Sequence, residues 1–162
     1  MKLELEVVKV EKPQGLNVII GQAHFIKTVE DIYEVLIGSM PSIRFGLAFC
    51  EASDKCLVRF QSNSKDLEKI AVENALKIGC GHCFFLAVEE AYPVNILNQI
   101  KQVPEVCRIF CATANPLEII ICQTAQGRGI LGVVDGFTPK GKETEADVIE
   151  RKELLRKLKY KL

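Results

Sequence analysis

The sequence predicts a single α/β domain in which a mixed β-sheet is packed by about four helices. Its length of 162 residues, with 48% hydrophobic and 26% charged side chains, is typical of one compact domain. Apolar runs of strand length alternate with amphipathic segments of helix length. Some predicted strands follow one another through hairpins and others through helices, which favours a mixed sheet. Residues 1–162 are therefore treated as one domain.

The first half of the chain shows clear strand and helix boundaries. Residues 3–10 alternate as a strand, and the turn Pro13-Gln14-Gly15 precedes a second strand over 17–20. Thr28 is a good N-cap for a helix that Pro41 ends. Residues 44–50 and 56–60 are predicted to form a hairpin. A second helix is expected to begin at Ser64 and to end at Gly79.

The second half contains four more strands and two helices. Residues 82–88 are almost continuously apolar, as in a strand buried on both faces. Pro93 is expected to begin a helix that runs to Val103, and strands are predicted over 106–111, 117–124 and 130–134. A charged C-terminal helix is predicted over about 145–161. Its inward residues are expected to be Val148, Leu155, Leu158 and Leu162.

Composition excludes several classes of partner. Lys plus Arg equals Asp plus Glu at 21 each, so no overall field favours nucleic acid or an anionic membrane. No apolar run could span a bilayer, and the N-terminus lacks the apolar region of a signal peptide. We therefore expect a cytoplasmic protein with neither nucleic acid nor membrane as partner. The seven cysteines are expected to be mainly reduced core residues.

Three motif matches fail because their structural context is wrong. Cys80-Gly81-His82-Cys83 matches a thiol redox motif, but it follows a predicted helix instead of opening one. The glycines from Gly127 to Gly132 match a dinucleotide fingerprint, but a strand and a turn follow them. The stretch from Gly136 to Glu143 misses a phosphate-binding P-loop by one residue.

The only two histidines each lie near a glycine, where strand and helix patterns meet. His24 lies between a strand end and the helix expected at Thr28, whose free backbone N–H groups would attract anions, with Lys27 adding a charge. His82 follows Gly79-Cys80-Gly81 and begins an apolar strand. Imidazole can relay a proton or carry a phosphoryl group near neutral pH. From local pattern alone, ligand binding and simple packing at a sheet end both stay open for these residues.

Loops in the second half add weaker candidates. Asn115 lies in a loop of small residues that would suit close contact or an ordinary Asn-Pro turn. Arg128, between Gly127 and Gly129, could pair with phosphate. Asp135 could hold a ribose hydroxyl or Mg²⁺. Solvated loop charges are an equal alternative for Arg128 and Asp135, and no residue set predicts a metal site.

Five blocks of sequence resemble the adenosine-specific kinase family, a small cytoplasmic domain of archaea and thermophilic bacteria. The resemblance extends from about residue 3 to the C-terminus. The blocks are 21–31, 45–52, 93–98, 112–116 and 127–136.

This resemblance implies binding of adenosine or AMP, a phosphorylated histidine, and a symmetric homo-oligomer, a trimer or a multiple of it. His82 is assigned as the phosphohistidine, with ATP or another phosphoryl donor and with Mg²⁺ as a possible cofactor. The expected substrate and phosphate contacts are Gly21, Gln22, His24, Lys27, Thr28, Asn115, Gly127, Arg128, Gly129 and Asp135.

Two other functions stay open at this point. One is a protein that binds or senses adenine nucleotides without turnover and carries a stable phosphohistidine. The absence of a recognisable ATP-phosphate loop in the sequence favours it. The other is a thiol redox protein that uses Cys80 and Cys83.

Overall fold

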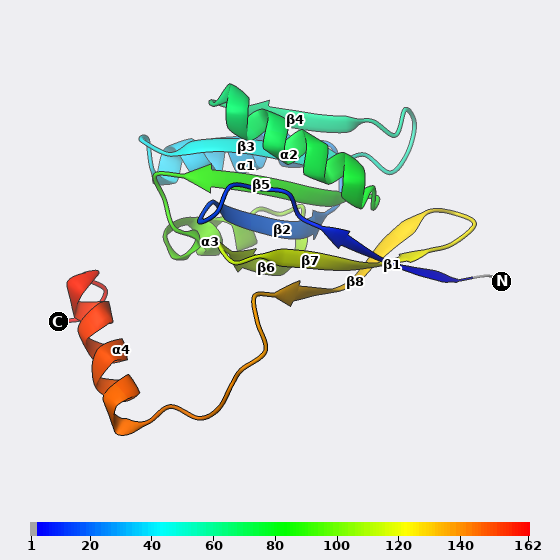
Figure 1. Cartoon of the computed structure of the whole chain (residues 1–162). Coiled ribbons are helices and arrows are strands. Elements are labelled where there is room, and N and C mark those ends of the chain that lie inside the picture. Colours follow the sequence, from blue (N-terminus) through cyan, green and yellow to red (C-terminus); the bar gives the residue numbers. More distant parts are fainter. Residues whose placement is uncertain (1–2) are drawn as a thin grey trace.

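The computed structural model describes residues 3–162, which form eight strands and four helices (Figure 1). In chain order they are β1 (Glu4–Lys9), β2 (Asn17–Ala23), α1 (Thr28–Ser39), β3 (Arg44–Cys50), β4 (Val58–Ser62), α2 (Lys65–Ile78), β5 (Cys83–Glu89), α3 (Pro93–Lys101), β6 (Val106–Thr113), β7 (Leu117–Gln123), β8 (Arg128–Asp135) and α4 (Glu145–Lys157).

The α/β class and the four helices are confirmed, but the strands form two sheets in place of one mixed sheet. Five strands lie in the order β4-β3-β5-β2-β6, and three in the order β1-β7-β8. Every pair among the described strands is antiparallel. The helices α1, α2 and α3 still connect parallel strands, but an antiparallel strand lies between the two in each case. For example, α1 connects β2 to β3, and β5 pairs with both.

Two apolar layers cover the two faces of the five-stranded sheet. On one face, α1 and α3 pack through Ile32, Leu36 and Ile96 against side chains such as Phe45. On the other face, α2 packs through Leu67, Ala71 and Ile78, and β7 of the smaller sheet contributes Ile119. The sheet is therefore buried on both faces in its middle, while its ends face solvent.

The predicted caps differ in outcome between the first two helices. Helix α2 follows Ser64 and ends at Gly79, as predicted, and Gly79 has the left-handed φ of 57° that suits glycine. The prediction of Thr28 as the N-cap of α1 is wrong, because Lys27 occupies that position. Thr28 is the first helical residue, fully buried, and its hydroxyl donates a hydrogen bond to the Phe25 carbonyl at 2.7 Å.

The expected inward face of α4 is also wrong. None of the residues of α4 is buried, Val148 and Leu155 are only half-buried, and Leu158 and Leu162 are exposed. The reason is the extended segment of residues 136–144, which carries the helix away from both sheets (Figure 1). Within residues 3–162, no helix is long and apolar enough to cross a membrane.

Candidate active site

The sheet brings the two histidines to the same end. Strands β2 and β5 pair so that Gln22 lies opposite Cys83, which places the residues after β2 beside the residues before β5. The backbone N–H of Ala23 donates to the His82 carbonyl at 2.9 Å. His24 and His82, which are 58 positions apart in the printed sequence, are therefore neighbours along the backbone of this edge.

His82 is held in an unusual backbone conformation. Its φ is +61°, in the left-handed region that residues other than glycine rarely adopt. Its N–H donates to the Cys50 carbonyl at 2.7 Å, so strands β3 and β2 hold it from both sides. Its ring stacks on Phe49 with 5.7 Å between ring centroids and 16° between ring planes. Such strain is often found at functional sites, because the surrounding structure must enforce it.

His24 lies in an exposed turn that strand β6 supports. Its N–H donates to the Glu105 carbonyl at 2.9 Å, while the residue itself is exposed. Phe25 follows with a φ of +80° and an exposed side chain. Phe25 and His82, both with left-handed backbone, thus lie in the two loops at this end of the β2–β5 pair. Of the two histidines, His24 is the exposed one.

Lys27 is present at this end, but its charge is already compensated. Its ammonium pairs with Asp31 and, at 3.0 Å, with Glu105. The hydrogen bond with Asp31 raises the pKa of Lys27 above its ordinary value, and the hydrogen bond with Glu105 makes a smaller contribution in the same direction. Glu105 is buried, and its Oε2 has no hydrogen-bond partner among residues 3–162. The ion pair therefore braces the start of α1 against β6, and a phosphate contact by Lys27 would have to compete with it.

Glu51 and Arg59 form a second ion pair at the same edge, which the sequence analysis missed. Both carboxylate oxygens of Glu51 accept from Arg59 Nη2 at 3.1 Å, and Oε2 also accepts from the Leu57 N–H at 3.1 Å. The hydrogen bond from the Leu57 N–H holds the pKa of Glu51 below its ordinary value, and Arg59 makes a smaller contribution in the same direction. The only sequence signal for Glu51 was its place in the block 45–52 that resembles the family.

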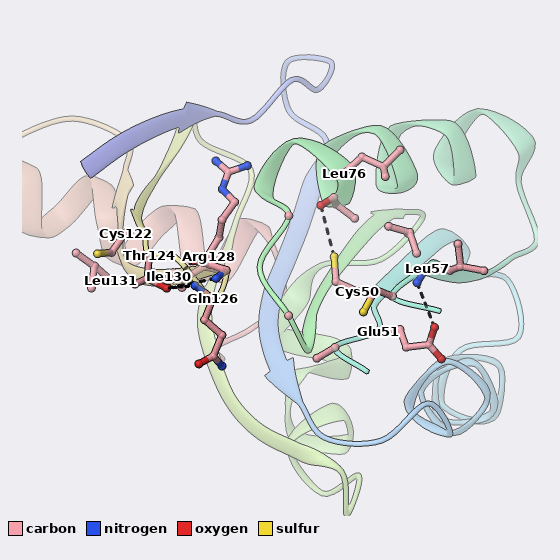
Figure 2. A pocket seen from close by; sticks show the side chains of 18 residues that line it. Cys50, Glu51, Leu57, Leu76, Cys122, Thr124, Gln126, Arg128, Ile130 and Leu131 are labelled. Carbon is pink, nitrogen blue, oxygen red and sulfur yellow. Dashed lines mark hydrogen bonds between the residues drawn. The ribbon is translucent and has the colours of Figure 1, made fainter. Parts of the chain in front are cut away.

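A cleft of about 640 Å³ lies beside the loop that carries His82, and we call it the hairpin cleft. One wall is the β7–β8 hairpin with Gly127, Arg128 and Gly129, and the other includes Glu51 and Gly81. Figure 2 shows Gln126 and Arg128 on one side, with Glu51 and Leu57 on the other. Its size suits a nucleotide-sized ligand. Three predicted contact residues therefore meet the His82 loop.

Arg128 connects the β7–β8 hairpin to α2 and β1. Its guanidinium donates to the Lys77 carbonyl at 3.0 Å and pairs with Glu6 at 2.6 Å. Together with Gln22 and Gly81 it also lines a smaller cavity of about 150 Å³. Gln22 and Arg128 are thus neighbours, as a shared site requires, although the charge of Arg128 is compensated by Glu6.

A second cavity, of about 720 Å³, opens beside the start of α1, and we call it the phenylalanine cavity. Phe25 and Phe60 line it and are 57% and 49% exposed. Lys27 and Arg59 also line it, and Arg59 lies opposite Phe49, the ring on which His82 stacks. Leu57 and Val58 line both this cavity and the hairpin cleft. No local pattern in the sequence indicates this cavity.

Several predicted contact residues lie elsewhere or have a structural role. Asn115 and Asp135 lie at the opposite end of the large sheet, where Thr113 pairs with Val18, so the structure does not bring them to the histidines. Asp135 accepts hydrogen bonds there from Thr113 at 2.7 Å and Asn115 at 3.0 Å. Gly21 is buried at a bulge, where an added Cβ would lie 2.7 Å from the Arg108 carbonyl oxygen.

The described residues do not offer a metal site or a reactive thiol pair. No group of three His, Cys, Asp or Glu side chains within residues 3–162 is arranged to hold a metal ion, and Asp135 is engaged elsewhere. Cys80 and Cys83 are buried, and burial raises the pKa of Cys80 to about 11 and that of Cys83 well above its ordinary value. These thiols are poor nucleophiles, which argues against the redox alternative.

Comparisons with known proteins found a family model and a solved structure that match this chain. A family model described as adenosine specific kinase matches residues 8–161. The crystal structure of the PH1918 protein from Pyrococcus horikoshii OT3 is similar over 99% of both chains, with 43% sequence identity and a TM-score of 0.95. None of the curated proteins compared with the chain matches it.

Proposed function

The chain belongs to the adenosine-specific kinase family, and we propose that it binds adenosine or AMP and transfers a phosphoryl group through His82. The observation that carries this proposal is the geometry of His82. Its backbone is fixed by two strands in a left-handed conformation, its ring is stacked on Phe49, and the preceding residue, Gly81, lines the hairpin cleft. Backbone strain of this kind clusters at active sites, so it supports a functional role for His82.

The proposed chemistry needs one nucleophilic nitrogen. A neutral imidazole nitrogen of His82 attacks the terminal phosphorus of ATP or another phosphoryl donor, so that an N–P bond forms and the bond to the leaving oxygen breaks. A hydroxyl oxygen of adenosine then attacks the same phosphorus. The N–P bond breaks, the new O–P bond gives AMP, and the hydroxyl proton passes to solvent.

The phenylalanine cavity is the best place for the nucleoside. Two exposed phenyl rings can stack on a purine, and aromatic stacking contributes about 1–3 kcal/mol for each base. The hairpin cleft adjoins this cavity through Leu57 and Val58. Its glycine-lined wall lets a phosphate chain approach the backbone closely.

The test is labelling with γ-labelled ATP followed by acid treatment, since phosphohistidine is acid-labile. His82→Asn should abolish the label and leave adenosine binding largely intact. Asparagine tolerates a positive φ, so this variant is expected to keep the fold. His24→Asn is the matched control and should retain most of the label. Label that persists in His82→Asn, with the variant folded, would show that His82 is the wrong residue.

A second function is favoured by the pairing of the two predicted phosphate-binding cations. Lys27 pairs with Asp31 and Glu105, and Arg128 pairs with Glu6. Transition-state stabilisation of a phosphoryl group needs available positive charge. A protein that binds adenine nucleotides and carries a stable phosphohistidine without turnover needs less available positive charge. In that case the protein would take up label stoichiometrically, and adenosine would not remove it.

A further inference from the structure

The Glu51–Arg59 ion pair lies at the wall that the two cavities share. Glu51 lines the hairpin cleft, and Arg59 lines the phenylalanine cavity. Leu57, which lines both, holds Glu51 through both of its backbone groups. Its carbonyl accepts from the Glu51 N–H at 3.0 Å, and its N–H donates to the Glu51 carboxylate at 3.1 Å (Figure 2). The carboxylate is therefore fixed at the junction of the two cavities.

The strand pairing places this ion pair beside the loop that carries His82. Glu51 directly follows Cys50, whose carbonyl accepts from the His82 N–H at 2.7 Å. Arg59 lies opposite Phe49 in the β3–β4 pairing, and the His82 ring stacks on that phenyl ring. A nucleotide whose phosphate reaches His82 and whose base lies in the phenylalanine cavity therefore has its ribose next to Glu51 and Arg59.

The ion pair has hydrogen-bonding capacity that residues 3–162 do not use. A carboxylate offers about four acceptor positions. Glu51 uses two of them for Arg59 Nη2 and one for the Leu57 N–H, which leaves one position on Oε1. The Nε of Arg59 is buried and has no partner among the described residues. Buried donors without a partner are rare in folded proteins, so a water molecule or a ligand is expected to accept from this Nε.

A sugar hydroxyl fits this combination of acceptor and donor better than a phosphate does. The hydrogen bond from the Leu57 N–H, with a smaller contribution from Arg59, holds the pKa of Glu51 below its ordinary value, so Glu51 is ionised near neutral pH. An ionised carboxylate repels a phosphate but accepts a strong hydrogen bond from a hydroxyl. One hydroxyl of a vicinal diol can donate to Glu51 while the other accepts from Arg59.

We propose that Glu51 recognises the ribose of adenosine by accepting a hydrogen bond from one of its two ring hydroxyls, and that Arg59 positions Glu51 and donates to the other. This inference rests on the proposed binding of adenosine and adds the residue that selects ribonucleosides over deoxyribonucleosides. Asp135, the candidate for a ribose contact in the sequence, lies at the opposite end of the large sheet and is engaged by Thr113 and Asn115.

The test is isothermal titration calorimetry of the full chain with adenosine, 2′-deoxyadenosine and 3′-deoxyadenosine. We expect the wild type to bind adenosine at least about tenfold more tightly than one or both deoxynucleosides, because a missing hydroxyl leaves the charged acceptor without its partner. Glu51→Gln should lose this preference. Its one acceptor oxygen is occupied by the Leu57 N–H and Arg59, so adenosine affinity falls to that of the less favoured deoxynucleoside, whose affinity changes little.

Glu89→Gln is the matched control. Glu89 pairs with Arg44 at 2.5 Å, and the two lie opposite each other in the β3–β5 pairing at the other end of the sheet. This variant also removes an ion pair between strands, and its preference for adenosine should equal that of the wild type. Equal binding of all three nucleosides by the wild type would overturn the ribose contact and leave adenosine binding intact. A preference that persists in Glu51→Gln, or equal weakening of all three in that variant, would also overturn it. A wild type that binds none of them would overturn the proposed function as well.

Discussion

His82 is positioned through its backbone as well as through its ring. The hydrogen bonds with Cys50 and Ala23 fix the main chain at a φ of +61°, and stacking on Phe49 fixes the plane of the imidazole. A nucleophile held in this way loses little further entropy when a phosphoryl donor arrives. His24 is not held in this way, because its side chain is exposed.

At the scale of single residues, the sequence indicated both histidines but not the charges around them. Histidine is rare here and stands out beside glycine, whereas Glu51, Arg59 and Glu105 are ordinary surface types in an unfolded chain. Their burial and pairing arise because β2 and β3 end at the edge where β4, β5 and β6 begin. Asp135 lies at the opposite end of the large sheet from the histidines. A loop position in the sequence does not say at which end of a sheet the loop lies.

The buried thiols lead to a prediction about alkaline pH. Burial raises the pKa of Cys50 and Cys80 to about 11 and that of Cys111 to about 12, against 9.0 as the ordinary value. Between these values the unfolded chain releases thiol protons that the folded chain keeps, so the free energy of unfolding should fall as pH rises from about 9 to 11. Denaturant titrations at several pH values measure this.

The control for this prediction is the exposed Cys56. The variant Cys50→Ala should show a shallower loss of stability over the same pH range, because one buried thiol has been removed. Cys56→Ala should follow the wild-type curve. Equal slopes for all three proteins would show that thiol ionisation does not govern alkaline stability.

At the scale of elements, the most local signals gave the best agreement. The strand over 44–50 and the boundaries of α2 were predicted because the hairpin pattern, Ser64 and Gly79 act within a few residues. The order of strands was not predictable in this way. It depends on which apolar faces meet across the sheet, and a helix connection is compatible with direct pairing or with an intervening strand.

The loop before β5 gives a prediction at this scale. A Cβ added at Gly81 would lie 2.9 Å from the Ala52 Cβ, so Gly81→Ala must displace the loop that carries His82. A shift of this kind should slow labelling of His82 by about 10- to 100-fold. Rapid-quench labelling measures the rate. Gly38→Ala in α1 is the matched control, because its added Cβ meets nothing within 4 Å, Gly38 lies outside both cavities, and the labelling rate should not change. Similar labelling rates for the two variants would show that the loop at Gly81 does not position His82 for phosphorylation.

The phenylalanine cavity gives a second prediction for elements that meet at the site. Phe25→Ala and Phe60→Ala should each weaken adenosine binding by about 1–3 kcal/mol, because each removes a ring on which the base can stack. Isothermal titration calorimetry measures the change. Phe137→Ala removes a ring that is 85% exposed in the extended segment before α4 and should leave affinity unchanged. Unchanged affinity in both cavity variants would place the nucleoside elsewhere.

At the scale of the whole molecule, the features of the site lie together. One end of the large sheet gathers the histidines, two ion pairs and two cavities, and the proposed chemistry belongs there. Sequence periodicity suggested a buried face on α4 because it cannot tell a helix that packs on its own chain from one without such a surface.

The central claim is that a phosphoryl group on His82 passes to adenosine. The most direct measurement isolates the labelled phosphoprotein free of nucleotide, adds unlabelled adenosine, and follows the label by chromatography. We expect label to leave the protein and to appear in AMP at a rate that rises with adenosine concentration. Label that stays on the protein, or that appears only as inorganic phosphate, would contradict transfer.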